Sequence, residues 1–99
     1  MSQYDPQQLQ QKFERWCELH REQVEAQQRF VEAEALYSEL QAYYQDPQWM
    51  TDREEDKPIE YSGSAHSIFS EDALWNMITE RNELAIQWMR LGLDALDNK

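Results

Sequence analysis

The fold is decided by residues 7–45, QQLQQKFERWCELHREQVEAQQRFVEAEALYSELQAYYQ, a stretch that contains neither glycine nor proline. Its apolar side chains recur at steps of three and four residues, the spacing that lines one face of an α-helix. Asp5–Pro6 forms a helix start, and Asp46–Pro47 provides a stop. We therefore predict a helix over about 6–45. Its apolar stripe, weak around Gln23, comprises Leu9, Phe13, Trp16, Leu19, Ala26, Phe30, Ala33, Tyr37, Leu40 and Tyr44.

A second helix is predicted over about 70–97. Ser70 is a capping residue, and Glu71 and Asp72 place negative charge at the positive end of the helix dipole. Two apolar rows lie along this helix, and because Arg81 and Asn82 fall within them, we expect a buried polar contact there that fixes the helix register. The first row comprises Leu74, Ile78, Arg81, Ala85, Trp88 or Met89, Gly92 and Leu96; the second comprises Trp75, Asn82, Ile86, Met89 and Leu93.

The connection, about 46–69, is longer than an ordinary loop. It contains an acidic cluster and the flexible tract Ser62-Gly63-Ser64, but also several apolar residues. We expect it to be a semi-ordered acidic loop that Trp49 and Tyr61 hold against the helices.

Composition sets further limits. The chain has 99 residues, two glycines, three prolines and few β-branched residues, which favours one all-α domain over a sheet. Twenty acids against nine Lys plus Arg give a net charge of −11. Long-range attraction to nucleic acid or to an anionic membrane is therefore excluded. A charged partner would be basic, although the charge also serves solubility alone.

The lengths of the two predicted helices indicate whether the chain forms a dimer. At 1.5 Å per residue the two helices would be roughly 60 Å and 40 Å long, so an antiparallel hairpin leaves the first turns of the longer helix uncovered. Those turns carry Leu9, Phe13 and Trp16, which we predict to be dimer contacts. The alternative is a break within Glu18–Gln28 and a three-helix bundle. The absence of glycine and proline favours the continuous helix and a homodimer.

Candidate chemistry is sparse. Cys17 and His20 could share a helix face, but a packed thiol beside a surface histidine is the simpler interpretation. Asp52, Glu54 and Asp56 alternate like the start of a calcium loop, yet the required glycine and the final glutamate are missing. We expect no catalytic residues, metal or cofactor. The polar N-terminus and the lack of a long apolar run indicate a soluble, cytoplasmic protein.

Part of the chain resembles a known family. The matching residues are Tyr43-Tyr44, Trp49-Met50, Asp52, Glu54 and Asp56, and then Ser70-Glu71-Asp72, Leu74-Trp75, Thr79-Glu80, Asn82-Glu83-Leu84-Ala85 and Met89. In order and spacing they are similar to the bacterial domain of unknown function 4298. The likeness covers a little over half the chain. The first helix matches only as a Glu-rich amphipathic segment, and the loop at Lys57-Pro58 and Ser67-Ile68-Phe69 departs from the family pattern. The resemblance implies a small all-helical protein and brings no activity.

The sequence favours a non-enzymatic protein–protein interaction module over an enzyme. Its candidate partner-binding residues are Tyr43, Trp49, Asp52, Glu54, Glu55 and Asp56. Tryptophan and tyrosine are frequent in binding hot spots, and the acids would attract a basic partner. The alternative is an acidic inhibitor that imitates nucleic acid and occupies the basic groove of a DNA- or RNA-binding protein.

Overall fold

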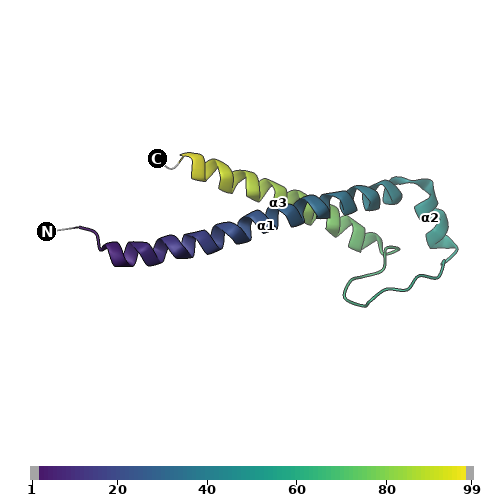
Figure 1. The fold of residues 1–99 in the computed structure, drawn as a ribbon. Helices are drawn as coiled ribbons and strands as arrows, with labels where there is room; N and C mark the ends of the chain where they lie inside the picture. The colour runs from purple at the N-terminus through teal and green to yellow at the C-terminus, as the bar shows by residue number, and fades with distance from the viewer. Residues whose placement is uncertain (1–2, 98–99) are drawn as a thin grey trace. The chain divides into compact units, whose positions relative to one another are not determined.

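The computed structural model describes residues 3–97 and is helical. It contains α1 (Pro6–Gln45), α2 (Pro47–Glu54) and α3 (Glu71–Asp97), and no strand occurs within the described residues (Figure 1). The predicted all-α class is therefore confirmed. The chain divides into two compact units, Met1–Glu39 (unit 1) and Leu40–Lys99 (unit 2), which are described separately.

Unit 1 is a single helical segment, the first part of α1. The Asp5 carboxylate starts the helix by accepting a hydrogen bond from the Gln7 amide at 3.0 Å, as the Asp–Pro pair predicted. α1 then continues without interruption from Pro6 through Gln45. A break within Glu18–Gln28 does not occur, so the alternative prediction of a three-helix bundle formed by that break is wrong.

Side chains in the first half of α1 make contacts along their own helix. Arg15 pairs with Glu18 at 3.0 Å, and both side chains are exposed. The Trp16 and His20 rings stack with their centroids 4.8 Å apart. Contacts between residues three and four apart stabilise a helix by only a few tenths of a kcal/mol, roughly 0.2–0.5 per pair. These local contacts therefore add little to the stability of this part of α1.

α2 lies inside the segment that the sequence assigned to a loop. The Asp46 side chain caps it by accepting from the Gln48 amide at 2.8 Å, and Pro47 occupies the first helical position. Asp46–Pro47 therefore ends α1, as predicted, and also starts a second helix, which was not predicted. The turn between the helices lets the chain change direction at Asp46.

The end of α2 has the hydrogen bonds of a Schellman motif. The Asp56 amide donates to the Arg53 carbonyl at 3.1 Å, and the Lys57 amide donates to the Asp52 carbonyl at 3.2 Å. Asp56 has φ +50°, the left-handed conformation that such an ending requires and that glycine usually supplies. The motif brings Lys57 back over the last turn of α2.

α3 begins at the predicted cap. The Ser70 hydroxyl accepts from the Ala73 amide at 3.3 Å. The expectation that Asn82 is buried is wrong: its Oδ1 lies 2.9 Å from Arg81 Nη1, but Asn82 is exposed, and Arg81 is half-buried. None of the described helices is both long enough and apolar enough to cross a membrane.

Candidate functional site

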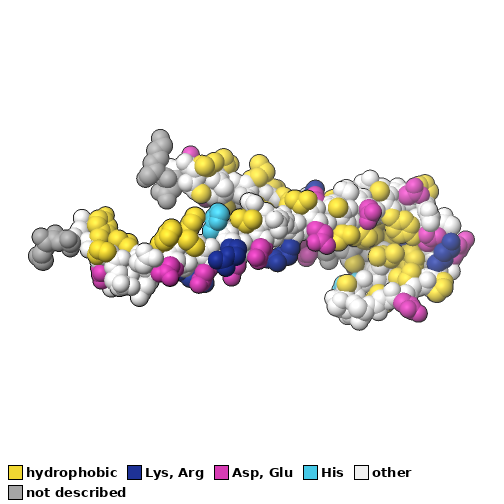
Figure 2. All heavy atoms as spheres, viewed as in Figure 1, with side chains coloured by type: hydrophobic (Ala, Val, Ile, Leu, Met, Phe, Trp, Pro, Cys, Tyr) yellow, Lys and Arg dark blue, Asp and Glu magenta, His cyan; other side chains and the backbone are white. Residues whose placement is uncertain are grey.

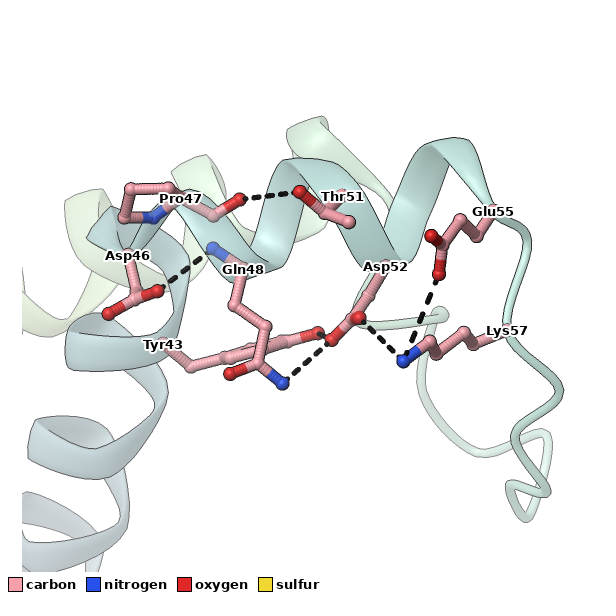
Figure 3. Close-up of polar contacts among 8 residues, drawn as sticks. All are labelled: Tyr43, Asp46, Pro47, Gln48, Thr51, Asp52, Glu55 and Lys57. Atoms are coloured by element: carbon pink, nitrogen blue, oxygen red, sulfur yellow. Dashed lines mark hydrogen bonds and ion pairs between the residues drawn. The ribbon is translucent and has the colours of Figure 1, made fainter.

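A polar elbow in unit 2 joins the last turn of α1 to α2 (Figure 3). It consists of Tyr43, Gln48, Asp52 and Lys57, with Asp52 at its centre. The Tyr43 hydroxyl donates to Asp52 Oδ2 at 2.6 Å, and Gln48 Nε2 donates to the same oxygen at 3.2 Å. Lys57 Nζ lies 3.2 Å from Asp52 Oδ1. Both carboxylate oxygens are therefore engaged, which permits an acid to be only 6% exposed.

The electrostatics of the elbow are set by these bonds. The hydrogen bond from Tyr43 lowers the pKa of Asp52, and Lys57 and Gln48 act in the same direction against the opposing effect of burial. The same bond raises the pKa of Tyr43 from 10.0 to about 12, because the neutral phenol is the hydrogen-bond donor to the carboxylate. The Asp52 carboxylate is thus held ionised and the Tyr43 phenol is held neutral. This arrangement opposes the use of either group as a proton-transfer catalyst near neutral pH.

Trp49 forms the apolar side of the same region. Its side chain is 4% exposed, and its indole Nε1 donates to the Ile68 carbonyl at 2.9 Å. Tyr44 meets it edge to face with centroids 5.0 Å apart, and the Arg53 guanidinium lies 5.3 Å from its ring centre. Trp49 therefore fixes the loop ahead of α3, as the sequence predicted. Tyr61 does not, since it is 62% exposed.

These contacts correct part of the predicted binding set. Trp49 and Asp52 are buried within unit 2, and Tyr43 is half-buried with its hydroxyl on Asp52, so these three are internal contacts. The expectation that Trp49 is exposed for a partner is wrong, because α2 turns its ring toward Tyr44 and the loop. Glu54, Glu55 and Asp56 are exposed and remain candidates for binding a partner.

A groove lies in unit 2 beside α3. Its volume is about 650 Å³. Its apolar walls are formed by Leu40 from the end of α1, Ile68 from the loop, and Leu74 and Met77 from α3. Glu80 and other polar groups also line it. The complete lining is Leu40, Ala65, His66, Ser67, Ile68, Ala73, Leu74, Asn76, Met77, Glu80, Arg81 and Leu84.

The sequence did not single out this groove. Met77 and Leu84 lie seven residues apart on α3, beside the apolar rows that the periodicity identified. That spacing is a signal for an additional apolar flank. The loop wall at Ile68 could not be inferred, because it depends on the hydrogen bond from Trp49.

The predicted dimer contacts are exposed. Leu9, Phe13 and Trp16 are each between 44% and 59% exposed on α1. Their use in a dimer stays a prediction.

Features of catalytic or metal sites are few. Among residues 3–97 no group of three His, Cys, Asp or Glu side chains is placed to hold a metal ion. Cys17 is a half-buried free thiol, and the neighbouring His20 stacks on Trp16. Within the same residues, every buried side-chain nitrogen and oxygen has a hydrogen-bond partner.

The fold and the site define a small all-helical protein with a polar elbow and an adjoining apolar groove. The chain belongs to the family described as Domain of unknown function (DUF4298), whose model matches residues 7–91. The match includes the first helix, where the sequence alone showed only a general likeness. Comparison with curated proteins finds no match, and neither does comparison with solved structures.

Proposed function

We propose that this protein is a non-enzymatic interaction module that binds a basic amphipathic segment of a protein partner in the groove of unit 2. One observation carries the proposal: an apolar groove of about 650 Å³ lies within the most acidic part of the chain. Residues 30–83 contain thirteen acids and three basic residues, a net charge of −10. An apolar face flanked by positive charge is the chemistry that complements such a surface.

The size and lining of the groove suit side chains of a partner. Pockets that bind ligands commonly measure roughly 300–1,000 Å³ and have apolar walls with a few polar groups. Met77 and Ile68 supply such walls, and the flexible Met77 side chain can adjust to the group that enters. Glu80 and Arg81 both line the groove, so the charges in its wall cancel and the negative charge of this part of the chain comes from acids outside the lining.

Two side chains of α2 support the groove. Ile68 is a groove residue, and its carbonyl is the acceptor for the Trp49 indole. Arg53 also lies 3.9 Å from Glu71 at the start of α3, which adds a second link between α2 and α3. Trp49 is therefore a positioning residue that holds the loop wall of the groove in place.

A synthetic helix-forming peptide of leucine and lysine tests the proposal. Its control is a leucine and glutamate peptide with the same apolar face. Binding is measured by fluorescence anisotropy of the labelled peptide over a range of salt concentrations. We expect the lysine peptide to bind, to weaken as salt screens the acids, and to exceed the glutamate peptide in affinity.

Met77→Glu separates groove binding from general attraction between opposite charges. The added acid should strengthen a purely electrostatic association, whereas a charge in the groove wall should weaken insertion of leucine side chains by about 10-fold or more. Gln87→Glu is the matched control, since Gln87 is exposed on α3 and is absent from the groove lining. Equal or tighter binding by Met77→Glu, with an unchanged circular-dichroism spectrum, would contradict the proposal.

A further inference from the structure

The apolar stripe of α1 is covered unevenly along its length. At steps of seven residues, a spacing that keeps side chains on one helix face, the side chain is buried at Tyr37 (7% exposed), half-buried at Phe30, and exposed at Gln23, Trp16 and Leu9. The side chains of the stripe therefore become exposed toward the start of α1. Phe13 and Leu19 extend the exposed part around Trp16.

The last turns of α3 carry too wide an apolar arc for one neighbouring helix. At 100° per residue, the apolar positions between Leu84 and Leu96 span about 220° of the helix circumference, against the roughly 100° stripe that faces one neighbour. Met89 at 67% exposed and Leu93 at 59% lie on one side of that arc. Figure 2 shows uncovered hydrophobic side chains over both the first turns of α1 and the last turns of α3.

The same two segments, residues 6–29 and 84–97, carry much less net charge than the stretch between them. Residues 6–29 contain four acids and four basic residues, and residues 84–97 contain two acids and one basic residue. Their net charges are 0 and −1, whereas residues 30–83 carry −10. A strongly acidic protein can associate with itself only where like charges do not face each other. The two exposed apolar segments meet that requirement.

The area is sufficient for a stable association. Nine large side chains of these segments expose on the order of 900 Å² per copy, which compares with the roughly 800 Å² that each partner contributes to a standard interface. They are Leu9, Phe13, Trp16, Leu19, Val24, Ile86, Met89, Leu93 and Leu96.

We propose that a second copy of this chain covers these segments, with residues 6–29 of one copy packed against the Met89 side of residues 84–97 of the other. The interface is nearly neutral, so the acidic stretch and the groove stay free for a different partner. Self-association and groove binding are thus two separate properties, and the dimer depends little on salt.

Sedimentation equilibrium over a range of protein concentrations tests this interface. The wild-type chain should be a dimer whose dissociation constant changes little with salt. Trp16→Glu and Met89→Glu should each weaken the dimer by about 30-fold or more, the effect of losing an interface hot spot. Gln11→Glu and Gln87→Glu add the same charge on the polar sides of α1 and α3, and they should leave the dimer intact.

Mixing variants tests which segments meet. Trp16→Glu mixed with Met89→Lys should form a heterodimer, because the new opposite charges face each other across the proposed interface. A wild-type chain that is monomeric at all concentrations overturns the proposal, as does equal dimerisation of Trp16→Glu and Gln11→Glu. Failure of the mixture to associate, with both variants helical by circular dichroism, overturns the pairing of α1 with α3. Peptide binding in the groove is measured separately and does not depend on these results.

Discussion

Unit 1 and unit 2 each place a tryptophan on a helix, and the two side chains have opposite surroundings. Trp16 on α1 is 57% exposed, and its ring stacks on His20, one turn further along the same helix. Trp49 on α2 is 4% exposed and donates to a carbonyl nineteen residues away at Ile68. The difference shows that the ring contact of Trp16 is local to its helix, while the contacts of Trp49 join segments distant in the sequence.

Replacing each tryptophan by alanine should give the largest contrast. Trp49→Ala removes a buried aromatic side chain and should lower the free energy of unfolding by about 3–5 kcal/mol. Trp16→Ala should change it by about 0.5 kcal/mol or less when the chain is dilute enough to be monomeric, because an exposed side chain loses little on truncation. Urea unfolding monitored by circular dichroism measures both.

A milder variant covers the case in which Trp49→Ala does not fold. Trp49→Phe keeps an aromatic ring against Tyr44, but it removes the indole N–H that bonds the Ile68 carbonyl together with part of the ring volume. The expected loss is about 1–3 kcal/mol, since a part-buried acceptor is left without its donor. A Trp49→Phe protein as stable as the wild type would show that the loop is held by other contacts.

The two Asp–Pro pairs provide a second comparison between the units. Asp46→Ala should cost about 1 kcal/mol, because the cap it removes belongs to a helix packed within unit 2. Asp5→Ala removes an equivalent cap at the end of α1, where a helix frays readily, so we expect a loss of only a few tenths of a kcal/mol. Equal losses in urea unfolding would contradict this distinction.

The same pairs show why the sequence predicted α1 and missed α2. Asp5–Pro6 precedes a long periodic segment, and the periodicity of that segment identifies the pair as a helix start. Asp46–Pro47 precedes only eight helical residues, too few for the apolar spacing to be distinguished from that of a loop. The ends of the long helices depend on caps and breakers, which are local, and this is why those ends could be predicted.

The site depended on information that the sequence does not display. Acidic side chains are rarely buried, so Asp52 was expected at the surface with Glu54 and Glu55. Its burial requires Tyr43, nine residues earlier, to face it across the turn at Asp46. The loop wall of the groove likewise depends on the hydrogen bond by which Trp49 holds Ile68 near α2. The composition of residues 30–83 predicted that this part of the chain is acidic, but it did not predict how the side chains of the elbow and the groove are arranged.

The contribution of the bond between Tyr43 and Asp52 to stability should depend on pH. Tyr43→Phe removes that bond but leaves Lys57 and Gln48 on the carboxylate. The lowered pKa of Asp52 stabilises the fold above its unfolded-state pKa of about 4, and this contribution is lost as pH falls through the folded-state pKa. The raised pKa of Tyr43 stabilises the fold below pH 10.0, and this contribution is lost as pH rises toward about 12.

The difference in unfolding free energy between the wild type and Tyr43→Phe should therefore be constant between about pH 5 and pH 9 and should narrow on both sides. Other ionisable groups are common to the two proteins, so their effects cancel in the difference. Tyr44→Phe is the matched control, because Tyr44 contacts Trp49 through its ring. A difference that stays constant from acid to alkaline pH would show that the Tyr43 hydroxyl does not bond the Asp52 carboxylate in solution. Trp49 would then be left as the main link that holds α2 in unit 2.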